Sequence, residues 1–319
     1  MTNNILILTE AGKNIGLGHY TRCSALRQAF EAVETPVQML VYQNEYDIAE
    51  HNIVKSNWLK DIDTVIANKE LYTVIVDSYL ADANIYKKLQ TVCKYLIAFD
   101  DYNRISYPCS LVINPNVFFC SIDYSNQTAK CIGGKDYVIL REEFRNKAPI
   151  GKENNNINNI LITIGGSDFR GILPKIIESC LATNIASITA VIPDDICYMG
   201  LDERLRILPS QSAESMYGLI QKAQIVISAC GQTLHELASM GKATLGICLD
   251  VDQIPNQQYY LNAGFLPFDI QWDDSTLSAK IKAGIAFYDS NGNSVSATVS
   301  NLFDKNGVLN IVSIIKKLS

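Results

Sequence analysis

Short apolar runs alternate with amphipathic stretches along the first half of the chain. Five of these runs have the composition of buried strands: residues 4–9, 37–41, 73–78, 95–101 and 111–117. Between the first two runs, Cys23, Leu26, Phe30 and Val33 recur at helical spacing and form one apolar face. Regular alternation of strand and helix predicts a parallel sheet covered by helices. Such sheets bind their ligands at the carboxyl ends of the strands.

The alternation stops at an Asn-rich stretch, residues 148–159 (APIGKENNNINN), and then restarts. This stretch is polar and has no periodicity, so it is the best linker candidate. A helix after it has Ser210 or Ser212 as its N-cap, and a second helix ends at Gly241. We therefore expect an α/β fold with two Rossmann-like domains facing a cleft, residues 1–150 and 157–319. The strands expected in the second half lie within residues 160–166, 187–193, 204–209, 224–233 and 243–250.

Composition and charge narrow the class of protein. A length of 319 residues suits two domains. The net charge of −6 argues against nucleic-acid binding, although backbone dipoles can still hold an anionic ligand. The nine cysteines are odd in number and form no CxxC pair, which favours reduced thiols and no zinc site. No run resembles a signal peptide or a membrane span, so we expect a cytoplasmic protein without membrane insertion.

One histidine stands at a glycine turn after the first predicted strand. In the sequence GLGH, Gly16 and Gly18 permit a tight turn, and His19 falls in the first turn of the following helix. The positive end of the helix dipole disfavours an imidazolium there, so we expect a neutral ring that can act as a general base. The alternative is a histidine that only packs or caps. We interpret His51 as a surface residue and His235 as structural.

Two glycine turns in the second half are candidates for a nucleotide site. Each follows a predicted strand and can present backbone donors to a diphosphate without a metal ion. Glu236 lies one turn into the helix after the second glycine turn, where a carboxylate can accept hydrogen bonds from a ribose diol. The alternative is that both turns simply connect strand to helix. The candidate nucleotide-binding residues of the two turns are Gly165, Gly166 and Ser167, and Gly231, Gln232 and Thr233.

Polar amides open a further predicted helix. Pro255 suits a first-turn position, which places Asn256 and Gln257 where they can address a donor sugar or cap the helix.

The order and spacing of these pieces resemble a known family. The motifs are IGLGHYTRCSAL, VIVDSYLAD, AFDDYNR, LVINPN, YVILREEF, ITIGGSD, SACGQTLHELASMGKAT and DQIPNQQYYLNAG. They are similar to those of the UDP-sugar hydrolases of pseudaminic acid synthesis and the related spore-coat polysaccharide group. Both groups resemble the N-acetylglucosaminyltransferase of peptidoglycan synthesis, which has the glycosyltransferase-B fold. The chain differs from the usual family pattern at Thr9-Glu10, in place of Arg-Asp, and at Cys230-Gly231, in place of two glycines.

The resemblance implies a role for each matched position. His19 would activate water, and Tyr79 and Asn256 would face the sugar. Glu236 would hold the ribose, and the turns at Gly165 and Gly231 the diphosphate. On the substrate side the same motifs supply Gly16, Gly18, Arg22, Asp77 and Gln257.

The reaction expected from this resemblance is metal-independent and inverting, with no cofactor. A UDP-activated amino sugar, such as UDP-2,4-diacetamido-2,4,6-trideoxy-altropyranose, would be hydrolysed to UDP and free sugar. One alternative is a glycosyltransferase that uses a UDP-sugar donor, and another is a non-catalytic subunit that binds nucleotide sugars. Transferases of this type often show a basic or apolar acceptor patch, and the sequence shows none, which favours hydrolysis.

Overall fold

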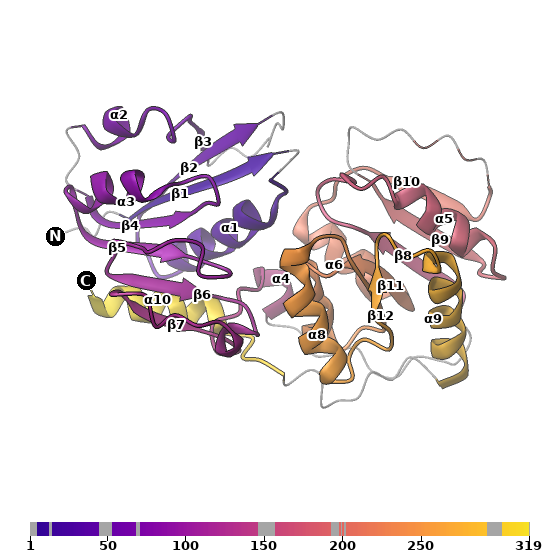
Figure 1. The fold of residues 1–319 in the computed structure, drawn as a ribbon. Helices are drawn as coiled ribbons and strands as arrows, with labels where there is room; N and C mark the ends of the chain where they lie inside the picture. The colour runs from indigo at the N-terminus through magenta and orange to yellow at the C-terminus, as the bar shows by residue number, and fades with distance from the viewer. Residues whose placement is uncertain are drawn as a thin grey trace. The chain divides into compact units, whose positions relative to one another are not determined.

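The structure is a computed structural model that describes residues 5–12, 15–44, 53–67, 71–145, 157–192, 198, 200, 202–291 and 302–318. The chain divides into two compact units. Unit 1 comprises Met1–Leu140 with Phe303–Ser319, and unit 2 comprises Arg141–Leu302 (Figure 1). Most of the predicted linker, residues 148–156, lies outside the described residues, as does His51.

Unit 1 is built on a seven-stranded sheet with the order β3-β2-β1-β4-β5-β6-β7. All neighbouring strands pair in parallel. The sheet contains the five strands expected from the apolar runs and adds two short strands at its edges, β3 and β7. The strands are β1 (Ile5–Gly12), β2 (Val37–Asn44), β3 (Val54–Lys55), β4 (Leu71–Asp77), β5 (Cys93–Phe99), β6 (Leu111–Asn114) and β7 (Lys130–Gly133).

Helices cover both faces of this sheet. Alternate residues of β1 point to opposite faces, so Ile5 and Ile7 belong to one apolar cluster and Leu6 and Leu8 to another. The first cluster includes residues of helices α1 (Gly18–Glu31) and α10 (Gly307–Leu318). The second includes residues of α2 (Ile62–Ile66) and α3 (Ala83–Gln90). A short 3-10 turn, η1, spans Phe119–Ser121.

The last helix corrects the predicted domain boundary. The prediction assigned residues up to 319 to the C-terminal domain, but α10, the yellow helix of Figure 1, packs on unit 1. Its Val308, Ile311 and Ile315 share an apolar cluster with Leu26 and Phe30 of α1. An amphipathic pattern shows that a helix has an apolar face but not which sheet covers that face. Sequence order alone therefore misplaced this helix.

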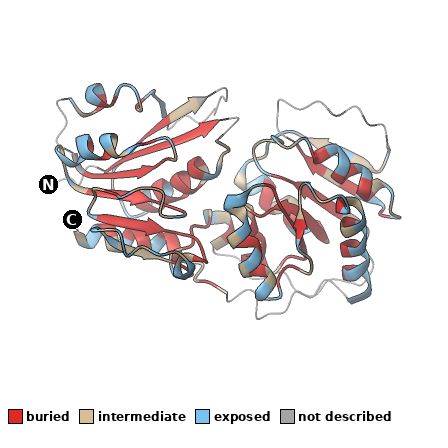
Figure 2. Ribbon diagram, in the orientation of Figure 1, coloured by how far each residue is buried: buried red, intermediate tan, exposed pale blue. Residues whose placement is uncertain are grey.

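Unit 2 repeats the architecture with a six-stranded parallel sheet in the order β10-β9-β8-β11-β12-β13. Its central strands are buried, as the red ribbons of Figure 2 show. The strands are β8 (Asn159–Thr163), β9 (Ser187–Val191), β10 (Leu205–Leu208), β11 (Ile225–Ala229), β12 (Thr244–Cys248) and β13 (Ile270–Gln271). The helical segments are α4 (Glu142–Arg145), α5 (Leu173–Leu181), α6 (Ala213–Lys222), α7 (Gln232–Met240), η2 (Val251–Gln253), α8 (Ile254–Asn262) and α9 (Leu277–Asn291).

Two predicted helix ends in unit 2 are confirmed. The Ser212 hydroxyl accepts a hydrogen bond from the Ser215 backbone N–H at the start of α6. Gly241 ends α7 in the left-handed conformation, with φ 65°.

Each sheet reverses its strand order at one place. In unit 1 the reversal lies between β1 and β4, and in unit 2 between β8 and β11. Loops at the carboxyl ends of these strand pairs flank a crevice in which parallel α/β sheets bind ligands. The predicted motifs follow these same strands: His19 follows β1 and Tyr79 follows β4, while Gly165 follows β8 and Gly231 follows β11.

Candidate active site

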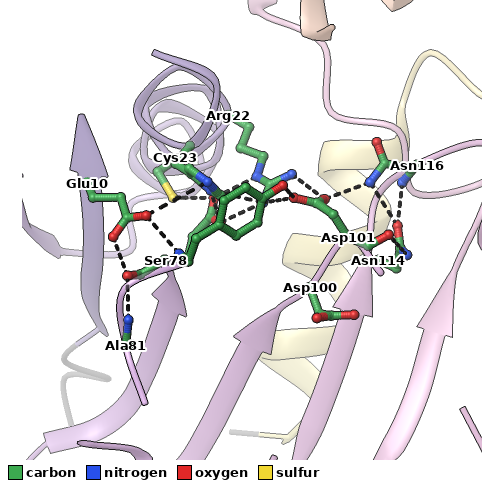
Figure 3. Close-up of polar contacts among 12 residues, drawn as sticks. Glu10, Arg22, Cys23, Ser78, Ala81, Asp100, Asp101, Asn114 and Asn116 are labelled. Carbon is green, nitrogen blue, oxygen red and sulfur yellow. Dashed lines mark hydrogen bonds and ion pairs between the residues drawn. The ribbon is translucent and has the colours of Figure 1, made fainter. Parts of the chain in front are cut away.

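The strand-order reversal of unit 1 gathers a cluster of charged side chains (Figure 3). His19 and Arg22 come from the first turns of α1, and Asp77 ends β4. Asp101 follows β5, and Tyr79 lies in the turn after β4. Sequence reasoning named four of these residues and missed Asp101, although its position directly after a buried strand was a usable signal.

His19 is a buried member of a histidine–aspartate pair. Its Nδ1 lies 2.6 Å from Asp77 Oδ1, and its Nε2 lies 3.9 Å from Glu10 Oε1. An ionised carboxylate only accepts hydrogen bonds, so Asp77 places the proton of the neutral ring on Nδ1. The Nε2 atom is then the one that can take up a further proton.

The protonation of His19 differs from the prediction. Burial alone lowers the pKa of the imidazole, but the charge of Asp77 and its hydrogen bond outweigh burial and raise the pKa above its ordinary value. The prediction that the helix N-terminus keeps the pKa low is therefore wrong. A carboxylate in direct contact with the ring acts more strongly than the partial charge of a helix end. The result is a stronger base.

Arg22 holds the cluster together rather than facing outward. Its Nε and one terminal nitrogen each donate to Asp77 at 2.6 Å, and the other donates to Asp101 at 2.6 Å. Burial raises the pKa values of both carboxyls, but the charge of Arg22 outweighs burial and lowers them. Arg22 and Asp77 were predicted on the substrate side. The structure makes both of them internal supports of His19.

Tyr79 is the partly exposed member of the cluster. Its hydroxyl donates to Asp101 Oδ2 at 2.7 Å, and its ring packs edge-on against His19 with centroids 4.3 Å apart. The exposed Tyr102 lies next to it, with ring centroids 5.4 Å apart. A ligand that reaches His19 therefore meets aromatic surface.

The two glycines before His19 have different roles. Gly16 has φ 79° and pairs with Gly12 in a bridge, so the turn itself requires glycine there. Gly18 is the exposed first residue of α1, its φ lies outside the left-handed range, and a Cβ built on it would meet no atom within 4 Å. Neither the backbone nor the packing demands glycine at position 18. Its small size leaves open space beside His19.

In unit 2, the glycine turns are open. Gly165 is exposed and has φ 97°, and a Cβ added to it would meet no atom within 4 Å. Gly166 and Ser167, which follow it, are partly exposed. Gly231 is the N-cap of α7 and supplies no side-chain cap. The first backbone N–H groups of a helix lack intrahelical acceptors, which suits this turn, with the partly exposed Gln232 and Thr233, to an anion.

The predicted amides of α8 separate into two kinds. Asn256 is only 6% exposed and donates to Cys230 O at 3.4 Å, beside the Gly231 turn. Its Oδ1 is buried and has no hydrogen-bond partner among the described residues. A buried unpaired acceptor is costly, so this atom is suited to a donor on a ligand. Gln257 instead donates to Ile270 O at 2.8 Å inside the core, which makes it structural rather than a substrate contact.

Glu236 is engaged within unit 2. Its two carboxylate oxygens accept from Arg141, Nε at 2.6 Å and Nη2 at 2.7 Å, and its side chain is 1% exposed. Arg141 lies in the motif YVILREEF, to which the sequence analysis gave no role, and its side chain is 21% exposed. The two hydrogen bonds from the Arg141 guanidinium orient the Glu236 carboxylate, and the guanidinium also covers it. His235, expected to be structural, is buried with Nδ1 2.7 Å from the Tyr260 hydroxyl.

Two further observations describe what the chain offers a ligand or a bilayer. In the described ranges, His, Cys, Asp and Glu side chains form no group of three or more that could hold a metal ion. Over the same ranges, no helix combines the length and apolar character needed to cross a membrane. The described cysteines are all free thiols.

Comparisons with known proteins show the fold. No family model matches the chain. An uncharacterized protein of Methanocaldococcus jannaschii is 26% identical over 74% of this chain, which spans 54% of that relative's length. The spore coat polysaccharide biosynthesis protein SpsG of Bacillus subtilis is 22% identical over 79% of this chain and 78% of its own length.

Solved structures match over nearly the whole chain. The spinosyn rhamnosyltransferase SpnG, complexed with thymidine diphosphate, has a TM-score of 0.67 and 12% identity, covering 98% of this chain and 100% of its own. MurG of Acinetobacter baumannii has a TM-score of 0.64 and 14% identity, covering 98% and 99%. The UDP-GlcNAc 2-epimerase of Neisseria meningitidis, bound to UDP-GlcNAc, has a TM-score of 0.61 and 13% identity, covering 98% and 100%. The chain therefore has the predicted glycosyltransferase-B fold with two Rossmann-like units.

Proposed function

We propose that the protein transfers a sugar from a nucleoside diphosphate sugar, with UDP as the expected carrier, to an acceptor hydroxyl. The observation that carries this proposal is the His19–Asp77 pair, at the strand-order reversal of one sheet in a glycosyltransferase-B fold. A histidine oriented by a buried carboxylate is a general base. SpsG, named for polysaccharide biosynthesis, supports a role in making a surface polysaccharide.

The chemistry follows from the position of the free nitrogen. His19 Nε2 accepts the proton of the acceptor hydroxyl while its oxygen forms a bond to the anomeric carbon. The bond from that carbon to the diphosphate oxygen breaks, and the diphosphate leaves with the electron pair. Asp77, which Arg22 holds in place, keeps the resulting imidazolium oriented and compensates its charge. A single displacement of this kind inverts the anomeric configuration.

Unit 2 supplies the expected nucleotide site. The open turns at Gly165 and Gly231 offer backbone N–H groups to the diphosphate, and the N-terminus of α7 adds its dipole. Asn256 Oδ1 offers an unpaired acceptor beside the second turn. The backbone N–H donors of the two turns can stabilise a leaving diphosphate without a cation, so turnover should survive chelation with EDTA.

Hydrolysis is the second candidate, with water in place of the acceptor alcohol. Hydrolysis is supported by the resemblance of the sequence motifs to those of the UDP-sugar hydrolases. The substrate would then be UDP-2,4-diacetamido-2,4,6-trideoxy-altropyranose. The comparisons and the exposed surface favour transfer over hydrolysis. Leu80 is 50% exposed and Tyr102 46% exposed beside Tyr79, so the unit does carry an apolar patch near His19 that sequence reasoning did not find.

One assay separates these functions. The purified protein is incubated with a panel of UDP-, GDP- and CMP-sugars, with and without alcohol acceptors, and free nucleotide is measured. Release that needs an alcohol supports transfer, and equal release without one supports hydrolysis. Nucleotide binding without release from any donor would leave only a binding subunit and overturn the proposal. Loss of activity in EDTA, restored by Mg²⁺, would contradict the metal-independent chemistry.

A further inference from the structure

Glu10 is a buried carboxylate that the proposed reaction does not use. It lies in β1, next to β4 in the sheet, and has no exposed surface. Its Oε1 accepts from the backbone N–H of Tyr79 at 2.7 Å, and its Oε2 accepts from the Ser78 hydroxyl. Figure 3 shows these contacts on the β1 side of the cluster. Charged hydrogen bonds of this kind are among the stronger ones in proteins.

The Ser78 hydroxyl extends this support into the turn after β4. Its oxygen accepts from the backbone N–H groups of Leu80 and Ala81, both at 3.0 Å. Glu10 therefore fixes the turn through Ser78 as well as directly at Tyr79. The position of that turn determines where the Tyr79 ring packs on His19.

Glu10 also faces the ring nitrogen that takes up the proton. Its Oε1 lies 3.9 Å from His19 Nε2, on the side of the ring opposite the Asp77 contact at Nδ1. An opposite charge within about 4–6 Å favours the protonated ring. The other groups that face the cluster are Arg22 and the Cys23 thiol from α1, Asp101 after β5 and the Tyr79 hydroxyl. Three carboxylates thus surround one guanidinium and one imidazole.

We propose that Glu10 is a positioning residue of the His19 centre, which holds the turn of Tyr79 and favours proton uptake at His19 Nε2. The proposal rests on the proposed function for the meaning of that proton uptake. Its structural part concerns His19 alone and can be measured without any substrate. Thr9-Glu10 is where the chain departs from the pattern of the family that it resembles, so sequence reasoning had marked the position without giving it a role.

The first experiment titrates His19 by NMR in the whole protein. The chain has three histidines, so His51→Gln and His235→Gln variants assign the remaining signal to His19. Glu10→Gln keeps the shape of the side chain and removes its charge, and should lower the pKa of His19 by about one unit. Glu34→Gln, an exposed site in the same unit, is the matched control and should leave it unchanged. An unchanged His19 titration in folded Glu10→Gln overturns the proposal.

The second experiment measures turnover as a function of pH, with whichever sugar nucleotide the panel assay shows to be the donor. Glu10→Gln should move the acidic limb of the kcat profile to lower pH and reduce kcat about tenfold, with a smaller change in KM. Glu10→Asp retains the charge and should recover part of the loss. A fall in kcat with no shift of the limb, unrelieved by Glu10→Asp, contradicts the proposal. If the wild type turns over no donor, the proposed function fails, whereas the NMR titration still decides the role of Glu10.

Discussion

The two sites at the strand-order reversals are built in opposite ways. In unit 1, the side chains of His19, Arg22, Asp77 and Asp101 bond to one another and are buried. In unit 2, the corresponding loops at Gly165 and Gly231 present backbone with open space around it. One site is a closed network of charges, and the other is a pair of open turns.

The difference indicates how the work is divided. A buried network of paired charges costs desolvation energy but fixes a base in one orientation before a ligand arrives. Open glycine turns and a helix N-terminus make a general anion site that needs no charged side chain. Unit 1 therefore suits proton transfer, and unit 2 suits binding of a diphosphate. Substitutions in each unit should separate these two roles.

The largest effect is expected at the base. His19→Ala should lower kcat by about 10²–10⁴, because general-base assistance is worth that much, while UDP affinity stays unchanged. His19→Asn should do no better, since an amide can hold a hydroxyl but cannot take its proton. Calorimetry with UDP and initial-rate assays measure both quantities. Near-normal turnover in His19→Ala would make the histidine structural.

The second prediction concerns the arginine that ties the network together. Arg22→Met leaves Asp77 and Asp101 buried without their cation, and should lower the free energy of unfolding of unit 1 by about 3–5 kcal/mol. Each unit has one tryptophan, Trp58 and Trp272, so urea unfolding of single-tryptophan variants follows each unit separately.

The surface pair of Lys88 and Asp63 provides the control for this experiment. Lys88→Met should change the unfolding free energy of unit 1 by less than about 1 kcal/mol, because both partners are exposed.

The stabilisation by the buried network should depend on pH. The pKa values of Asp77 and Asp101 are lowered in the folded unit, so the stabilisation from these carboxylates is present above their unfolded pKa values and is lost as the pH falls. The difference between wild type and Arg22→Met should therefore shrink below about pH 4. A pH-independent difference would mean that the charges do not cause it.

Most of the fold could be predicted from the sequence, because parallel strands that are buried on both faces appear as short runs of consecutive apolar residues. Residues 74–76 and 225–227 are apolar at every position, and they lie within β4 and β11. The helix α10 was assigned to the wrong unit because its apolar face is compatible with either sheet. The pattern of apolar residues shows which face of a helix is buried, but it does not show which sheet covers that face.

The surroundings of the predicted site residues could not be derived from the sequence for the same reason. His19, Tyr79 and Asn256 were predicted from motifs, and the structure shows their surroundings. The raised pKa of His19 depends on Asp77, which is 58 residues away in the sequence and 2.6 Å away in space. The two residues of the Arg141–Glu236 ion pair are 95 positions apart in the sequence. Contacts between loops on different strands depend on sheet order, which a linear pattern of apolar residues does not encode.

The third prediction tests what Glu236 contacts. Glu236→Ala should weaken UDP binding about ten- to a hundredfold, as expected for loss of a charged hydrogen bond or of the support of Arg141. The 2′-deoxy form of UDP separates the two causes. If Glu236 holds the ribose, wild type binds the deoxy nucleotide more weakly and Glu236→Ala binds both equally. If the carboxylate only orients Arg141, wild type binds the two nucleotides equally and Arg141→Lys shows a similar loss. Unchanged UDP affinity in Glu236→Ala rejects both roles.

The smallest effects are expected at the glycines of unit 2, where stability and binding should separate. Gly165 has φ 97°, so Gly165→Ala should lower the free energy of unfolding of unit 2 by about 1–2 kcal/mol. Gly231 has φ −90°, and a Cβ there meets only the Gln253 amide at 3.9 Å. Gly231→Ala should therefore change the unfolding free energy by less than about 0.5 kcal/mol. If a diphosphate lies against this turn, the added methyl group meets it, and calorimetry should show UDP affinity reduced about tenfold. Wild-type affinity in a folded Gly231→Ala protein would place the diphosphate elsewhere and leave the second turn as a connection between strand and helix.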